Sequence, residues 1–367
     1  MFRREYLLGS IGAGLAALGG RVAAQPAPDP LRATLKHTVG RRETVAGMVA
    51  VTIEGNDTRI AACGSSGVAG LAMDGDTVFE MMSITKIFTS LLLADMVVRG
   101  EVAFDDPVAK YLPVALHARG RPITLLDLAS YRSGLPLNPS ADWRGYDDLT
   151  EARVLECLSR YVPKHAPGTH YEYANFAFGV LGIALARRAG KSYETLLIER
   201  ICNPLGLNHT RITLTDEMQR HLVQGHDLDL KPVARWNVPA LPGMAFVCSN
   251  AKDLTVFLKV CMGLTPSPLR EPLARLLQTR GTTSLAGTDT GLGWFVTSDR
   301  GEDIVWKSGL GGGCNTFIGF SGQKRRGAIV LSNFIWRPID TGTINLGMNL
   351  IEPDFHPVDF KALYPFF

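Results

Sequence analysis

Ser83 and Lys86 form the pattern with the most chemical content in this sequence, because they lie one helical turn apart. Residues i and i+3 share a helix face, and the apolar positions of the run 83–99 recur with a helical period. The amine of Lys86 can therefore reach the hydroxyl of Ser83. Such a hydroxyl becomes a good nucleophile when a neighbouring base takes its proton, and a partly desolvated amine can be that base. The same spacing also arises by chance in a chain of this size, so it needs support.

A second candidate pair, Tyr173 and Asn175, lies where a helical run is predicted to begin, next to Phe176. A phenol there can move a proton between Ser83 and a leaving group. The neighbouring amide can orient Lys86 or a substrate carbonyl. Taken alone the pair carries little weight, since aromatic residues and asparagine are common at helix starts.

A third segment, Lys307-Ser308-Gly309, ends an apolar strand and leads into Leu310 and three glycines. Glycine lets a substrate backbone lie close along a strand edge. The N–H of Leu310 can pair with that of Ser83 to hold a developing oxyanion. Lys307 supplies a fixed positive charge that suits a substrate carboxylate. By itself, the segment is more simply explained as a glycine-rich loop beside an exposed lysine.

The elements that must position these residues come from both ends and the middle of the chain. Apolar or alternating runs predict strands at 48–53, 58–62, 293–297, 304–308, 315–320 and 328–333. Helical patterns occupy the middle, at 83–99, 124–130, 149–158, 176–189, 193–201 and 251–262. We predict an α/β (α+β) fold in which helices flank an antiparallel sheet of about five strands built from both chain ends. The sheet part covers about 25–75 and 285–367, the helical part about 76–284, and the active site lies between them.

Composition excludes several classes of protein. With 46% apolar and 20% charged residues the chain is an ordinary globular protein, and a net charge of +3 without a long basic run gives no reason to expect nucleic acid as a partner. The six cysteines form no CxxC pair and the histidines show no metal-ligand spacing, so we expect no metal and no cofactor. A chain that buries a large core needs no disulfides, although export would permit them. We expect a monomer.

Residues 1–24 are predicted to be a signal peptide. Arg3 and Arg4 precede an apolar stretch that ends in Val22-Ala23-Ala24, and the paired arginines resemble a twin-arginine export signal. An ordinary secretory signal is the alternative. No other run is apolar enough to span a bilayer, and no cysteine marks a lipid anchor. We therefore expect one mature domain, 25–367, in the periplasm without a stable membrane anchor.

The order of the three segments resembles the serine β-lactamase and penicillin-binding DD-peptidase superfamily, and specifically its class C branch. The resemblance covers nearly the whole mature chain. Further stretches similar to the family are 100–102, 105–108, 111–113, 123–128, 133–136, 204–207, Thr210 and 291–294. It implies a β-lactamase/transpeptidase-like fold and an acyl-enzyme mechanism.

The resemblance also implies roles for individual residues. Ser83 would be the acylated nucleophile and Lys86 its proton partner. Tyr173 would be the base for acylation and for activating the deacylating water. Lys86 and Tyr173 stay alternatives for the base and can titrate as a unit. Asn175 would orient Lys86 and the substrate amide.

Substrate-binding positions follow in the same way. Asn138 stands where class C enzymes usually carry a longer glutamine, and Ser308 stands where they usually carry threonine. Asn333 and Arg337 fall near positions that help hold the substrate carboxylate. Together with Lys307, Gly309 and Leu310, these residues complete the predicted substrate site.

The resemblance leaves the substrate open. Lys307 and export favour a substrate with a carboxylate, which both a β-lactam and a peptide ending in D-Ala possess. We expect a β-lactamase, with a D-alanyl-D-alanine carboxypeptidase or endopeptidase as the first alternative. A carboxylesterase comes next, although such members often have His or Trp in place of Lys307, and a non-catalytic peptidoglycan-binding module comes last. The Gly-x-Ser-x-Gly of α/β-hydrolases and a complete P-loop are both absent from the sequence.

Overall fold

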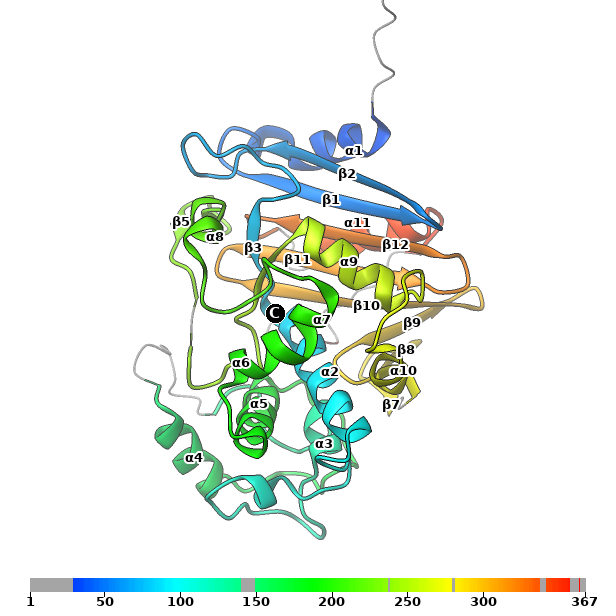
Figure 1. Cartoon of the computed structure of the whole chain (residues 1–367). Coiled ribbons are helices and arrows are strands. Elements are labelled where there is room, and N and C mark those ends of the chain that lie inside the picture. The colour runs from blue at the N-terminus through cyan, green and yellow to red at the C-terminus, as the bar shows by residue number, and fades with distance from the viewer. Residues whose placement is uncertain are drawn as a thin grey trace, which may run out of the picture.

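The computed structural model describes residues 29–139, 149–236, 238–278, 281–336, 341–356 and Leu363. Within these residues an eight-stranded antiparallel sheet crosses the molecule in the order β2-β1-β12-β11-β10-β9-β8-β7 (Figure 1). Its strands are β1 (Gly47–Glu54), β2 (Asp57–Gly64), β7 (Gly281–Thr282), β8 (Thr288–Thr290), β9 (Phe295–Asp299), β10 (Glu302–Gly311), β11 (Cys314–Ser321) and β12 (Arg326–Ser332). Two small sheets pair β3 (Val78–Glu80) with β6 (Cys248–Asn250) and β4 (Gly225–His226) with β5 (Pro232–Val233).

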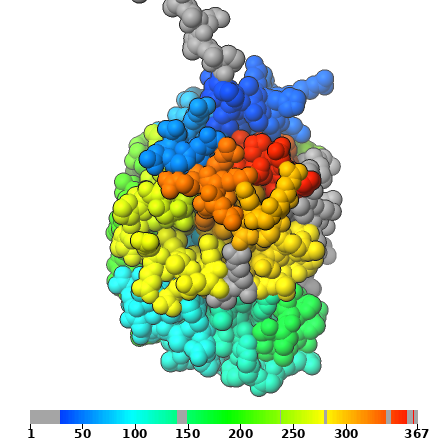
Figure 2. All heavy atoms as spheres, turned by 90° about the vertical axis from the view of Figure 1, so that its right-hand side faces the viewer, coloured from blue at the N-terminus to red at the C-terminus, as the bar shows by residue number. Residues whose placement is uncertain are grey.

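The two ends of the chain meet in the large sheet, which confirms the predicted fold class. β1 pairs with β12 from Met48 opposite Ser332 to Glu54 opposite Arg326. Figure 2 shows the blue N-terminal segment lying beside the orange and red C-terminal segments. The short strands β7 and β8 extend the sheet beyond the predicted strands, because two or three residues are too few to give a periodic signal.

The helices fall into those that cover the sheet and those that form the helical part. They are α1 (Pro30–Val39), α2 (Thr85–Val98), α3 (Leu125–Ala129), α4 (Glu151–Arg160), α5 (Asn175–Ala189), α6 (Tyr193–Leu197), α7 (Asn203–Leu205), α8 (Asp216–Arg220), α9 (Ala251–Cys261), α10 (Arg270–Gln278) and α11 (Thr341–Ile351). Short turns of tighter or wider helix are η1 (Gly40–Arg42), η2 (Met82–Ile84), η3 (Val108–Tyr111) and η4 (Ile198–Cys202). The predicted helices in the middle of the chain match α2, α3, α4, α5, α6 and α9 to within a few residues.

Helices α9 and α11 cover opposite faces of the sheet, with α9 in front of it in Figure 1. Gly347 of α11 packs on Phe317 of β11, and Leu258 of α9 packs on Gly327 of β12. Gly327 pairs with Phe320, which lies three residues after Phe317 on β11. Because side chains alternate along a strand, Gly327 faces the side of the sheet opposite to Phe317. The sheet is thus buried on both sides. Helices α2 and α5 belong to the helical part, which lies below the sheet in Figure 1.

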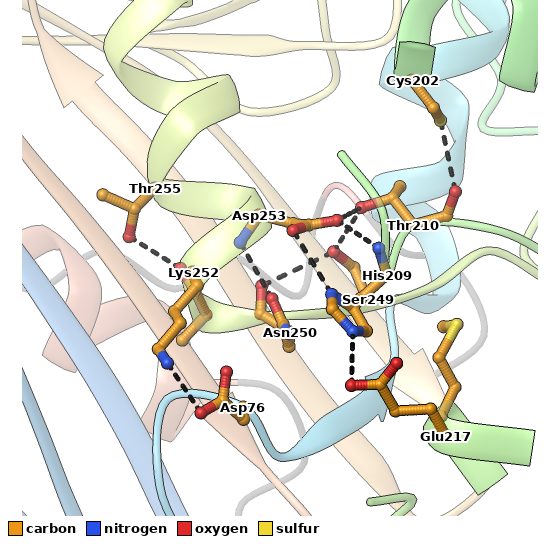
Figure 3. Close-up of polar contacts among 12 residues, drawn as sticks. Asp76, Cys202, His209, Thr210, Glu217, Ser249, Asn250, Lys252, Asp253 and Thr255 are labelled. Carbon is orange, nitrogen blue, oxygen red and sulfur yellow. Dashed lines mark hydrogen bonds and ion pairs between the residues drawn. The ribbon is translucent and has the colours of Figure 1, made fainter. Parts of the chain in front are cut away.

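A polar network fixes the start of α9 and with it the strand β6 (Figure 3). The side chain of Asn250 caps the helix by accepting a hydrogen bond from the N–H of Asp253 at 2.8 Å. The carboxylate of Asp253 accepts bonds from the N–H of His209 at 2.7 Å and the hydroxyl of Thr210 at 2.9 Å. The hydroxyls of Thr210 and Ser249 are 2.8 Å apart. This network holds the loop after α7 against β6, and β6 leads back to the segment beside η2.

The predicted signal peptide, residues 1–24, lies outside the described residues. Of the helices in the described part of the chain, none has both the length and the apolar character needed to cross a bilayer. All six cysteines are free thiols.

Candidate active site

Ser83 lies in η2, a single turn that joins β3 to α2. The N–H of Met81 donates to the carbonyl of Val247 at 2.9 Å, and the hydroxyl of Thr316 on β11 donates to the carbonyl of Met81 at 3.2 Å. Met82 has a φ of 48°, a left-handed conformation that costs energy for a residue other than glycine. Ser83 therefore follows a strained residue, and contacts with the sheet and with the segment before β6 hold that turn in place.

Lys86 is completely buried and its ammonium nitrogen meets three oxygen atoms. Nζ lies 2.9 Å from Oγ of Ser83, 2.8 Å from Oδ1 of Asn175 and 2.9 Å from the carbonyl oxygen of Met244. Burial lowers the pKa of Lys86 well below its ordinary value of 10.5. A neutral amine keeps two N–H bonds, enough for Asn175 and Met244, and then directs its lone pair at Ser83.

Tyr173 approaches Ser83 from the other side. Its hydroxyl donates to Oγ of Ser83 at 2.9 Å, and its ring stacks on that of Tyr131 with centroids 4.8 Å apart. Backbone hydrogen bonds tie the two loops together: the N–H of Glu172 donates to the carbonyl of Tyr131 at 2.8 Å, and that of Phe176 donates to Leu137 at 3.0 Å. The loop that carries Tyr173 is thus fixed before α5 begins.

Lys307 of β10 is also completely buried, and aromatic rings lie closer to its amine than to that of Lys86. Nζ donates to the hydroxyl of Tyr131 at 3.1 Å and lies 4.2 Å from the ring centroid of Phe295 and 4.7 Å from that of Tyr173. A cation over a ring face is attracted by the negative π surface. Tyr131 and Tyr173 therefore link the positive charge of Lys307 to the hydroxyl of Ser83.

The free edge of β10 follows from the register of its hairpin with β11. The turn residues Gly312 and Gly313 both have positive φ, as in the two-residue hairpin turns whose flanking residues share hydrogen bonds. Alternation along the ladder then directs the N–H of Leu310 away from β11. β9 pairs with β10 only as far as Trp306, so this N–H lies at an unpaired edge.

Gly309 brings that edge against the segment that precedes Ser83. A Cβ at Gly309 would lie 2.3 Å from the carbonyl oxygen of Met81 and 2.9 Å from Cβ of Met82. Only glycine fits, and its absence of a side chain sets how close β10 comes to η2. Lys307 shares this face of the strand, whereas Ser308 is opposite Phe317 and points its side chain to the other face.

The remaining predicted residues lie in different places. Asn138 directly follows Leu137, whose carbonyl binds the first turn of α5, so it lies beside the loop that carries Tyr173. The carboxamide of Asn333 accepts from the N–H of Gly47 at 2.7 Å and donates to the carbonyls of Ser65 and Gln224, at 3.2 and 3.0 Å. These bonds join three backbone segments. Arg337 lies outside the described residues.

Sequence reasoning missed Met244, Tyr131 and Phe295. Met244 contributes through its carbonyl, which no residue pattern reveals. Tyr131 lies just before the stretch 133–136 that is similar to the family. Its positive φ of 59° marks an unusual backbone conformation, which the sequence does not display. Among the described residues, no group of three or more His, Cys, Asp or Glu side chains is placed to hold a metal ion.

Comparison with known proteins decides the family. A family model described as Beta-lactamase matches residues 31–334. The chain belongs to the β-lactamase family. This family match covers every residue placed at the site above, and the match to residues 31–334 spans both parts of the fold. The relatives that are similar to this chain are named either as β-lactamases or as D-alanyl-D-alanine carboxypeptidases.

Curated members of the β-lactamase family support the assignment along most of the chain. The D-alanyl-D-alanine-carboxypeptidase/endopeptidase AmpH of Escherichia coli (strain K12) is 30% identical over 305 residues, which cover 78% of this chain and 78% of that protein. A β-lactamase of Pseudomonas fluorescens is 27% identical over 293 residues, which cover 70% of this chain and 80% of that protein.

Solved structures of the family share the fold. A β-lactamase/D-alanine carboxypeptidase from Pseudomonas syringae aligns with a TM-score of 0.78 at 21% identity, covering 89% of this chain and 99% of that one. A class C β-lactamase from Rhodobacter sphaeroides aligns with a TM-score of 0.75 at 23% identity, covering 87% and 97%. At these identities the alignments show the fold alone.

Proposed function

We propose that this chain is an exported serine hydrolase that opens β-lactam rings through an acyl-enzyme on Ser83. One observation carries the proposal: Oγ of Ser83 lies 2.9 Å from both Nζ of Lys86 and the hydroxyl of Tyr173. A nucleophile within hydrogen-bond distance of two groups that can take its proton is the arrangement that covalent acyl transfer requires. The work is that of a single domain, residues 25–367, which follows the proposed signal peptide and acts in the periplasm.

In the proposed reaction, Oγ of Ser83 attacks the carbonyl carbon of the lactam while its proton passes to the Lys86–Tyr173 pair. The same pair then gives a proton to the lactam nitrogen as the C–N bond breaks, leaving an ester on Ser83. A water molecule loses a proton to the pair and attacks that ester. The pair returns this proton to Oγ of Ser83 as the ester bond breaks, which restores the hydroxyl and releases the opened product.

The charges that form during the reaction have partners in the site. We place the developing oxyanion between the N–H groups of Ser83 and Leu310, since Leu310 offers its N–H at the free edge of β10. Asn175 keeps Lys86 in line by accepting its hydrogen bond at 2.8 Å. Lys307 attracts the substrate carboxylate, and Asn138 lies at the acyl side of the site.

A D-alanyl-D-alanine carboxypeptidase is the second candidate function. It is favoured by the similarity to AmpH, which at 30% identity over 305 residues exceeds the 27% of the P. fluorescens β-lactamase over a comparable length. Both functions need an acyl-enzyme and a substrate carboxylate. They differ in how quickly water reaches the ester on Ser83.

The test is to give the purified protein a chromogenic cephalosporin and, in parallel, a D-Ala-D-Ala peptide. We expect rapid cephalosporin turnover that Ser83→Ala lowers by about a thousandfold or more. Ser90→Ala is the matched control, because Ser90 lies on α2 and its hydroxyl has no hydrogen-bond partner among the described residues. It should leave turnover nearly unchanged.

Two other outcomes are informative. A long-lived ester on the tryptic peptide of Ser83, seen by mass spectrometry together with release of D-Ala from the peptide, would replace the first proposal with the second. Turnover that survives Ser83→Ala would contradict both.

A further inference from the structure

Glu80 is a buried carboxyl group that the proposed reaction does not use. It ends β3, three residues before Ser83, and is only 6% exposed. Its partner across the small sheet is Cys248 of β6. A glutamate is seldom buried without a function or a strong partner, so its surroundings are informative.

The carboxylate of Glu80 holds the backbone of Trp236. The N–H of Trp236 donates to Oε1 of Glu80 at 2.9 Å. The indole of Trp236 in turn lies against the end of β10, since a Cβ at Gly311 would be 3.5 Å from two of its ring carbons. The hydrogen bond that Trp236 donates to Glu80 therefore fixes the backbone of Trp236 where its ring meets the strand.

The same carboxylate lies against the turn that follows β10. A Cβ at Gly312 would lie 2.4 Å from Oε2 of Glu80 and 3.0 Å from its Cδ, so the carboxylate occupies the space of a side chain there. Gly311, the neighbour of Gly312, contacts the methyl group of Met82 in the same way. One side chain thus touches the turn 311–313 and Trp236, and its own backbone leads into Ser83.

We propose that Glu80 is a positioning residue for the reaction proposed above: its ionised carboxylate holds Trp236 and the turn 311–313 so that the edge of β10 receives the substrate. This inference rests on the proposed function, because it concerns the same site. Leu310, which offers its N–H to the oxyanion, is one residue from that turn. An ionised carboxylate accepts the N–H of Trp236 more strongly than a neutral acid does.

The environment of Glu80 makes this hold sensitive to pH. Burial raises the pKa of Glu80 from 4.5 to about 7, while the N–H of Trp236 and the charge of Arg235 act in the opposite direction. The titratable groups that face it are Arg235, Cys248 of β6 and Cys314 of β11. Burial raises the pKa of Cys248 to about 12 and that of Cys314 well above 9, so both thiols stay neutral. Glu80 is then the group of this cluster that changes charge near neutral pH.

The test compares the full-length protein with Glu80→Gln from pH 5.5 to 8.5, using the chromogenic cephalosporin. Glutamine keeps the shape of the side chain but does not ionise. We expect the KM of Glu80→Gln at pH 8 to be about fivefold higher than that of the parent protein, with kcat within about twofold. At pH 5.5 the two KM values should agree, because the parent carboxyl is then protonated. Glu54→Gln, at an exposed glutamate of β1, should follow the parent at every pH.

Fluorescence supplies a readout that does not depend on turnover. The tryptophan emission of the parent should shift with a midpoint near pH 7, and this shift should vanish in Glu80→Gln and in Trp236→Phe. A fluorescence shift without any acylation of Ser83 would keep the role of Glu80 in holding Trp236 and reject the proposed function. A KM step and a fluorescence shift near pH 7 that both persist in Glu80→Gln would overturn the inference.

Discussion

Two buried lysines serve the site, and their surroundings differ. The amine of Lys86 contacts three oxygen atoms and lies 5.2 Å from the ring centroid of Tyr173, whereas that of Lys307 contacts one phenol hydroxyl and lies only 4.2 Å from the ring centroid of Phe295. Burial lowers the pKa of Lys86 and so favours a neutral amine that can take a proton. The closer ring faces at Lys307 favour a cation, and we propose that Lys307 supplies the positive charge of the site while Lys86 carries the proton.

Lys307→Met tests the proposed role of that charge. Methionine keeps the apolar stem beside Tyr131 and Phe295 but removes the ammonium. We expect KM for an anionic cephalosporin to rise about tenfold or more, since a charge-assisted hydrogen bond to the substrate is lost, and KM for a neutral ester to change by less than about threefold. Steady-state kinetics on both substrates gives the comparison. An equal loss for both substrates would mean that Lys307 only supports the aromatic rings.

At this scale the sequence was informative where chemistry is local. Ser83 and Lys86 are three residues apart, so their contact follows from helix geometry. Tyr131 reaches Lys307 only because two loops and a strand meet in the fold. The contact of Met244 is made by its backbone carbonyl, which every residue type has, so the sequence could not indicate it. Asn333 stays a prediction for substrate binding, while its carboxamide binds three backbone groups that only the folded chain brings together.

At the scale of elements, the approach of β10 to η2 sets the width of the site. Gly309→Ala should test it, because the added Cβ would lie 2.3 Å from the carbonyl oxygen of Met81. We expect a loss of about 2 kcal/mol in the free energy of unfolding, measured with urea, together with slower acylation of Ser83.

Gly322→Ala is the control for that substitution. Gly322 lies in the turn between β11 and β12, and a Cβ there meets no atom within 4 Å. Its effect on stability should stay within about 0.5 kcal/mol. Equal behaviour of the two variants would refute the argument from close approach.

The elements themselves were mostly predictable, for reasons that differ between strands and helices. Runs such as 315–320 and 328–333 are long enough to show their apolar pattern, and β11 and β12 lie there. The turn η2 was included in the predicted helix, because Ser83 and Lys86 satisfy helical spacing whether the first turn is tight or regular. Strand order is a property of tertiary pairing, and only the meeting of the two chain ends could be inferred.

For the whole molecule, Glu80 makes stability depend on pH. Its pKa is raised to about 7 in the folded protein, whereas in the unfolded chain it is near 4.5. Between these values the unfolded chain releases the proton and the folded protein keeps it, so stability is full below pH 4.5 and falls as the pH rises to about 7. The whole change amounts to about 3 kcal/mol.

Glu80→Gln removes this titration. The free energy of unfolding of the variant should therefore gain on that of the parent as the pH rises from 5 to 8, by up to about 3 kcal/mol, in urea denaturation at each pH. Glu54→Gln should run parallel to the parent. If Glu80→Gln also ran parallel, the carboxyl would not be held in its neutral form by burial. A gain in stability would mean that the same group both assists substrate binding and lowers stability above neutral pH, a trade-off common at functional sites.

The pairing of β1 with β12 has a consequence for how the protein is made. A ribosome releases Ser83 and Lys86 long before it reaches β10, so the growing chain carries the proposed nucleophile without the strand that supplies Lys307 and Leu310. The sheet closes only after β12 has been synthesised, through contacts between residues that are far apart in sequence, which makes folding slow. The proposed competence for acylation therefore comes last, and a truncation before β10 yields a chain that bears Ser83 and Lys86 but neither Lys307 nor Leu310.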